Sequence, residues 1–139
     1  MTYPPWLSRY RGIPFRPHGR TPSGLDCWGL VWLIYAREYR IELPSFGSCY
    51  VGTTDPAIPR LMDSESQGEL WTPVELEAIR LGDVLLFRRG PLPNHVGFAL
   101  NSDEMIHTEH RHGVLREKIR GPIWERRLYG AFRHRAFPG

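Results

Sequence analysis

The chain has 139 residues, of which 41% are hydrophobic and 24% are charged, and its formal net charge is +3. This length and composition are typical of one globular domain, and we expect residues 1–139 to form a single unit without repeats or linkers. The longest apolar run, Gly29–Ala36, has eight residues. A membrane span needs about 20, so we expect no membrane insertion. Because no basic region followed by an apolar stretch opens the chain, we expect no Sec signal peptide.

Residues 1–24 are rich in proline, glycine and arginine, and we expect them to form an ordered loop. The clearest helix then runs from Cys27 to about Tyr39, where apolar residues recur at helical spacing and proline is absent. Asp26, or less favourably Ser23, is placed to cap the start of this helix by accepting hydrogen bonds from open backbone N–H groups.

Residues 44–80 are interrupted by four prolines, and we predict one short helix there, at about Ile58–Asp63. From Leu81 onward, short apolar runs separated by short turns predict an antiparallel meander of about five strands. These strands are Val84–Phe87, Val96–Leu100, Met105–Thr108, Gly113–Arg116 and Leu128–Phe132. A helical half followed by a run of strands indicates the α+β class, with the helix packed on the sheet.

Arginine and lysine gather late in the chain, between Arg111 and Arg135. A basic surface of this kind suits nucleic acid or another anionic polymer, such as a bacterial cell wall. Because Glu109, Glu117 and Glu125 are interleaved with the cations, we favour a solvated face and expect no direct binding of nucleic acid.

Cys27 is the candidate catalytic nucleophile, because it begins the predicted helix. At that position the helix dipole and open N–H groups stabilise the attacking thiolate, and the same groups can receive an oxyanion. The alternative is a buried structural cysteine on the apolar face of the helix, which is equally compatible with this position. The second cysteine, Cys49, lies in the turn-like stretch Phe46–Tyr50 without an activating context, and we interpret it as structural.

A thiolate nucleophile needs a base, and the base needs an orienting group. His95 and His107 flank a predicted turn near Ser102, so antiparallel pairing makes them cross-strand neighbours. Their Cβ atoms would be about 4.5–5.5 Å apart if the two residues are directly opposite. We expect His95 to act as general base and His107 to hold its second ring nitrogen. Either histidine taken alone is also compatible with a structural or exposed role.

A metal site is the other chemistry open to these side chains. Zinc accepts cysteine and histidine ligands, so Cys27, His95 and His107 would be joined by His110 or His112. The sequence has no Cys-x₂-Cys or His-x₃-His pair on one element, however. We therefore expect neither a metal nor another cofactor.

Four motifs resemble, in order, those of the NlpC-type cell-wall cysteine peptidases. The motifs are Thr21–Val31 (TPSGLDCWGLV), Leu81–Phe87, Asn94–Phe98 (NHVGF) and Met105–Thr108. In the family they supply the nucleophile, a Gly-Asp strand, the base and the orienting residue, which implies these roles for Cys27, His95 and His107. The resemblance also implies a papain-like fold and hydrolysis of amide bonds in peptidoglycan stem peptides, commonly the D-γ-glutamyl–diaminopimelate bond.

Trp28, Gly12–Phe15 and His18–Arg20 resemble most the branch of this family found in tail-assembly proteins of long-tailed phages and related gene-transfer particles. This implies a location at the tail tip, beside hub and baseplate proteins, where a local opening of the cell wall helps DNA delivery. The protein would be made in the bacterial cytoplasm and carried by the particle.

The chain departs from the family at the oxyanion site. Many cellular members carry a tyrosine 12 residues before the cysteine, where this chain has Phe15. Either a longer loop lets Tyr10 act as the oxyanion donor, or that donor is absent. Asn94 replaces the usual small serine, and we identify no separate wall-binding domain. Two alternatives stay open: a structural tail-tip or baseplate subunit with vestigial or no catalysis, and an acyltransferase on the same fold.

Overall fold

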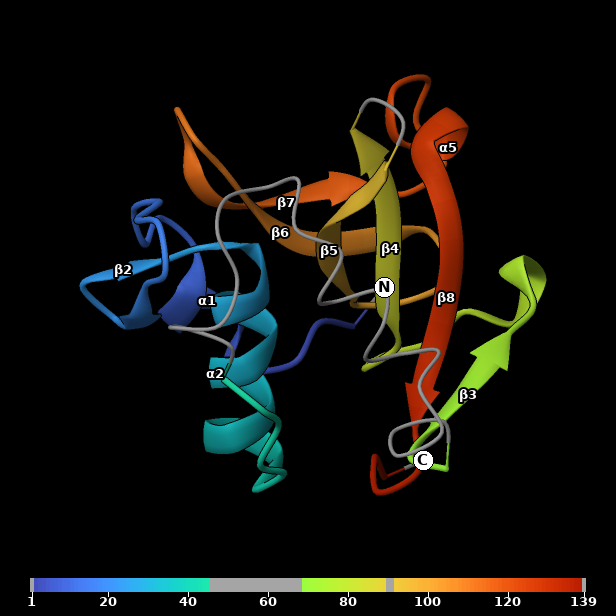
Figure 1. Ribbon diagram of the computed structural model, residues 1–139, viewed down its shortest axis with the longest axis horizontal. Coiled ribbons are helices and arrows are strands. Elements are labelled where there is room, and N and C mark those ends of the chain that lie inside the picture. The colour runs from blue at the N-terminus through green and yellow to red at the C-terminus, as the bar shows by residue number, and fades with distance from the viewer. Residues whose placement is uncertain (1, 46–68, 90–91, 139) are drawn as a thin grey trace.

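The computed structural model describes residues 2–45, 69–89 and 92–138, which form a helical layer beside a sheet (Figure 1). The helical layer comprises α1 (Leu7–Tyr10), the short hairpin of β1 (Arg20–Thr21) and β2 (Gly24–Leu25), and α2 (Cys27–Tyr39). Cys49 and the helix predicted at about Ile58–Asp63 lie outside the described residues.

Helix α2 begins and ends where the sequence predicts. The Asp26 carboxylate accepts a 2.7 Å hydrogen bond from the N–H of Gly29, which satisfies one of the donors left open at a helix start. Five of the helix side chains have no exposed surface: Trp28, Leu30, Val31, Ile34 and Tyr35. Of the helices in the described ranges, none is long and apolar enough to cross a membrane.

The sheet has six strands in the order β3-β8-β4-β5-β6-β7, and every neighbouring pair is antiparallel. Its strands are β3 (Trp71–Val74), β4 (Val84–Arg89), β5 (Leu92–Ala99), β6 (Glu104–Glu109), β7 (Gly113–Lys118) and β8 (Leu128–His134). The five predicted strands are all present, but they do not form one continuous meander, because β8 lies beside β4 and not beside β7. The sixth, β3, contains Pro73, which argues against a central strand but is tolerated in β3 because this strand forms one edge of the sheet.

Two apolar clusters cover the two faces of the sheet. Leu86 of β4 belongs to the cluster that contains α2, whereas its neighbour Phe87 belongs to a smaller cluster with Trp124. Since successive residues of a strand point to opposite faces, α2 and α5 (Trp124–Arg127) cover opposite faces of the sheet. The α+β architecture expected from the sequence, a helix packed on an antiparallel sheet, is therefore confirmed.

Candidate active site

Cys27 is the first residue of α2 and is partly exposed. The helix packs against β5 and β6, the strands that carry His95 and His107. A thiol at this position lies at the positive end of the helix dipole, which favours the thiolate. The fold therefore presents the predicted nucleophile in the electrostatic setting that the sequence indicated.

The loop that precedes α2 is tied to the start of the helix through Asp26. One carboxylate oxygen accepts from Gly29 N–H and from Nη1 of Arg20, both at 2.7 Å, and the other accepts from the N–H of His18 at 3.1 Å. The Arg20 guanidinium also donates to the carbonyl oxygen of Ser45 at 2.6 Å. These bonds fix the residue next to Cys27 from three segments of the chain.

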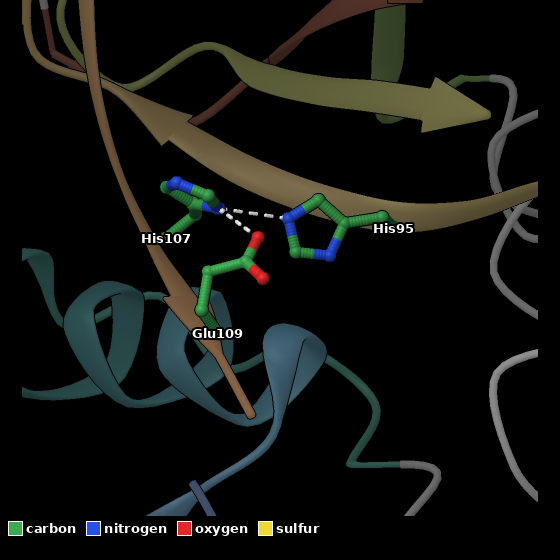
Figure 2. Close-up of side chains that lie close together, drawn as sticks. All are labelled: His95, His107 and Glu109. Carbon is green, nitrogen blue, oxygen red and sulfur yellow. Dashed lines mark hydrogen bonds and ion pairs between the residues drawn. The ribbon is translucent and has the colours of Figure 1, made fainter. Parts of the chain in front are cut away.

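His95 and His107 are joined by a 2.9 Å contact between Nε2 of His95 and Nδ1 of His107 (Figure 2). Both side chains are buried. The two rings meet nearly edge to face, at an interplanar angle of 80°. The structure thus brings together the two histidines that the sequence predicts to act together.

In the pairing of β5 with β6, the two histidines are not directly opposite each other but are offset by two residues. The paired residues are Phe98 with Ile106 and Ala99 with Met105. The same register extended along both strands would place Gly97, and not His95, opposite His107. A Cβ atom added to Gly97 would lie 3.6 Å from the Cβ of His107. His95 is therefore a diagonal neighbour on the same face, and it reaches His107 over a residue without a side chain.

The other ring nitrogen of His107 contacts a carboxylate, Glu117, for which the charge pattern of the sequence predicts a solvated face. Nε2 of His107 lies 2.8 Å from Oε1 of Glu117 on β7, and Oε2 of Glu117 accepts from Nε1 of Trp124 at 3.1 Å. The Trp124 ring stacks on His95, with centroids 5.2 Å apart, and meets His107 edge to face. Neither residue carries a sequence signal, because their roles depend on strand pairing and on the short helix α5.

Three side chains at this site could hold a metal ion: His95, His107 and Glu109 offer ligand atoms within 4.8 Å of one another (Figure 2). Oε1 of Glu109 is 3.7 Å from Nδ1 of His107. Two nitrogens and a carboxylate oxygen suit zinc. The metal site considered from the sequence used His110 or His112 as a further ligand. In the structure His110 stacks on Phe15, with ring centroids 4.0 Å apart.

The structure does not bring Tyr10 to Cys27. The Tyr10 hydroxyl donates a 2.5 Å hydrogen bond to Glu38, and burial together with this carboxylate raises the pKa of Tyr10. Glu38 follows Cys27 by 11 residues (38 − 27) on α2. At about 1.5 Å per residue, this places it about 16 Å away along the helix axis. Phe15 has no hydroxyl, so neither residue considered for the oxyanion donor supplies one at the start of α2.

Comparison with known proteins gives one consistent result. A model of the NlpC/P60 family matches residues 12–133. The Murein DD-endopeptidase MepS/Murein LD-carboxypeptidase of Escherichia coli K12 is 28% identical over 124 residues, which cover 89% of this chain and 57% of that protein. The Probable endopeptidase NlpC of the same organism is 24% identical over 129 residues, covering 91% of this chain and 73% of the relative. The chain thus spans little more than half the length of the first of these relatives.

Solved structures show the same fold. The NlpC/p60 domain of the peptidoglycan hydrolase SagA superposes with a TM-score of 0.63 at 19% identity, covering 89% of each chain. An NlpC/P60 family protein from Bacillus cereus ATCC 10987 superposes with a TM-score of 0.67 at 21% identity, covering 93% of this chain and 37% of that one. The fold predicted from the four motifs is confirmed by these similarities.

Proposed function

The chain belongs to the NlpC/P60 family, and we propose from this premise that it is a cysteine peptidase that hydrolyses amide bonds in peptidoglycan. The observation that carries the proposal is the buried 2.9 Å contact between His95 and His107, which pairs a base with an orienting group in a chain whose helix α2 begins with the motif cysteine Cys27. A nucleophile, a base and an orienting group are the parts that hydrolysis by a thiol requires.

In the proposed reaction, Nδ1 of His95 takes the proton of Cys27, and the thiolate attacks the carbonyl carbon of the scissile amide. N–H groups in the first turn of α2 stabilise the oxyanion of the tetrahedral intermediate. His95 then gives the proton to the leaving amine, which breaks the C–N bond and leaves a thioester on Cys27. A water molecule deprotonated by His95 hydrolyses the thioester and regenerates the thiol.

We propose the D-γ-glutamyl–diaminopimelate bond as the bond cleaved, supported by the resemblance of the motifs around Cys27 and His95 to their family counterparts. The similar E. coli protein is named a DD-endopeptidase and LD-carboxypeptidase, so three bonds need to be distinguished. Purified muropeptides digested with the protein should give fragments that end at D-glutamate, as read by mass spectrometry. Cleavage that survives in a folded Cys27→Ala variant would contradict the proposed nucleophile.

We further propose that the protein acts at the tail tip of a phage-like particle, beside hub proteins, and opens the wall for DNA delivery. The support is the resemblance of Trp28, Gly12–Phe15 and His18–Arg20 to the tail-assembly branch. Antibodies against the protein should label the distal end of purified particle tails in electron micrographs. Particles that carry a full set of tail proteins but lack this chain would contradict the location.

A structural subunit without catalysis is the second candidate, and the placement of Tyr10 favours it. The Tyr10 hydroxyl is bound to Glu38, and the described residues offer no tyrosine in its place at the start of α2. Thiol reactivity separates the two candidates. An enzyme should alkylate at Cys27 faster than at Cys49 at neutral pH, whereas a structural subunit should show no such preference.

A further inference from the structure

We propose that Glu117, held by Trp124, is a positioning residue that sets the tautomer of His107 and, through His107, the tautomer of the base His95. The inference rests on the proposed function, in which His95 is the base. Glu117 lies on β7 and contacts His107 rather than the nucleophile. Its role is therefore to prepare the histidine pair before the substrate arrives.

The hydrogen-bonding capacity of each group fixes where the protons lie along this chain of contacts. A carboxylate only accepts hydrogen bonds, whereas a neutral imidazole has one N–H and one accepting nitrogen. In the 2.8 Å contact with Glu117, Nε2 of neutral His107 must therefore carry the proton. Its Nδ1 then accepts from Nε2–H of His95 across 2.9 Å. This leaves Nδ1 of His95 unprotonated and able to take a proton.

Trp124 makes a carboxylate the side chain best suited to position 117. The indole N–H can only donate, and it donates to Oε2 of Glu117 at 3.1 Å. Two donors, from His107 and Trp124, thus converge on one side chain. A glutamine has a single accepting oxygen and would present an NH₂ group to one of them.

The Glu117 carboxylate is also held rigidly. β6 and β7 are paired over six residue pairs, with Met105 opposite Glu117, so the carboxylate is carried on a strand within the sheet. His107 has no exposed surface, and Trp124 is 5% exposed. A group held this way keeps its geometry without rearrangement, which is what positioning a base requires.

The neighbouring carboxylate, Glu109, does not fill the same role. Its Oε1 is 3.7 Å from Nδ1 of His107, beyond hydrogen-bonding distance. That nitrogen is also the one that faces His95. Glu109 therefore lies toward the nitrogen of His107 that accepts a hydrogen bond from His95, whereas Glu117 contacts the nitrogen that donates one.

The test compares Glu117→Gln with Glu117→Asp and with Glu125→Gln as the matched control. Glu125 lies on α5 next to Trp124, and its side chain is 55% exposed. With muropeptide substrate, we expect Glu117→Gln to lower kcat by about 10–10²-fold with KM changed less than about twofold, comparable to the loss of the outer hydrogen-bond partner of a metal-bound histidine. Glu117→Asp keeps both accepting oxygens and should recover part of the loss, and Glu125→Gln should match the native protein.

A second readout follows the tautomers directly. Side-chain ¹⁵N NMR of the native protein should show His95 protonated at Nε2 and unprotonated at Nδ1, and Glu117→Gln should populate the other tautomer. Trp124→Phe keeps an aromatic ring but removes the N–H, and it should shift the populations in the same direction to a smaller extent. Unchanged tautomers in Glu117→Gln, or a kcat equal to that of Glu125→Gln, would overturn the inference. A native protein without Cys27-dependent cleavage would instead overturn the proposed function, and the NMR result would still decide the role of Glu117.

Discussion

His95 and His107 share a 2.9 Å contact between ring nitrogens although they occupy diagonal positions on β5 and β6. Gly97 lies beside His107, and a Cβ atom added to it would be 3.6 Å from the Cβ of His107 and 3.0 Å from Sδ of Met105. Both rings also pack against Trp124 of α5, which covers this side of the sheet. The pair is thus held by strand register and by one aromatic ring, and its function can be tested through each histidine.

Replacing His107 tests the orienting role. In His107→Ala, His95 loses its acceptor, so we expect kcat to fall by about 10²-fold or more, as when the third member of a catalytic triad is removed. His107→Asn offers an amide oxygen close to the position of Nδ1 and should retain more activity than the alanine variant. Assays of peptidoglycan cleavage by the two folded variants give the comparison.

The matched control is His110→Ala, which removes another histidine three residues farther along the chain. His110 is exposed and stacks on Phe15. Its loss should leave kcat within about twofold of the native value. Equal losses in His107→Ala and His110→Ala would contradict a specific role for His107.

The helix, its cap and the five predicted strands follow from local signals, and so does the pairing of two histidines across a turn. The periodicity of Cys27–Tyr39 and the capping preference of Asp26 act within a few residues. Glu117 could not be predicted in this way, because its partners His107 and Trp124 lie on different elements. The register of β5 against β6 is equally non-local, since a shift of two residues keeps every side chain on the same face and leaves the apolar pattern unchanged.

The position of Tyr10 also depends on a contact that local sequence signals cannot predict. Its distance in sequence from Cys27 left open whether a longer loop returns it to the site. The structure instead buries its ring and pairs its hydroxyl with Glu38. The α1 segment packs beside the C-terminal part of α2, a tertiary contact that spacing along the chain does not encode.

Substituting Gly29 tests the loop that fixes the start of α2. A Cβ atom at this position would lie 2.1 Å from the carbonyl oxygen of Gly19 and 3.0 Å from the Asp26 carboxylate, so the loop must move. We expect Gly29→Ala to lower the free energy of unfolding by about 1–3 kcal/mol, as for other overpacked sites, and to reduce kcat by displacing Cys27. Urea unfolding and the cleavage assay measure the two effects. Gly121→Ala, whose added Cβ has no atom closer than 3.6 Å, should leave both near native values.

Stability should fall in acid because of His134. Burial lowers the pKa of His134 below its ordinary value of 6.5, and its Nδ1 accepts a hydrogen bond from the N–H of Ala136 at 3.0 Å. A histidine whose pKa is lower in the folded protein binds protons more readily when unfolded. Its contribution to stability is therefore present above about pH 6.5 and is lost as the pH falls below that value through the folded-state pKa.

A His134→Asn variant should remove part of this pH dependence while keeping an acceptor for the Ala136 N–H. The measurement is the free energy of unfolding in urea between pH 7.5 and about pH 5 for both proteins. The native curve should decline more steeply than the variant curve below about pH 6.5. Parallel curves would show that other groups produce the acid sensitivity.

Zinc should inhibit the proposed cleavage by binding to the histidine pair together with Glu109. Ligand atoms in a tetrahedral site with bonds of about 2.0–2.1 Å lie about 3.3 Å apart. The separations here bracket that value: 2.9 Å between the two histidine nitrogens and 3.7 Å from Nδ1 of His107 to Glu109. Coordination would replace the hydrogen bond that orients His95, so added zinc should abolish cleavage and a chelator should restore it.

The contribution of Glu109 distinguishes this site from coordination by the thiolate and one histidine. Glu109→Gln removes the carboxylate ligand, so the zinc concentration for half inhibition, measured relative to the variant's own uninhibited rate, should rise by about tenfold for a loss of about 1.4 kcal/mol of binding. Isothermal titration calorimetry on the Cys27→Ala variant should still detect binding of one zinc ion, because the three proposed ligands remain. Unchanged inhibition in Glu109→Gln, combined with no binding to Cys27→Ala, would assign the metal to the thiolate instead.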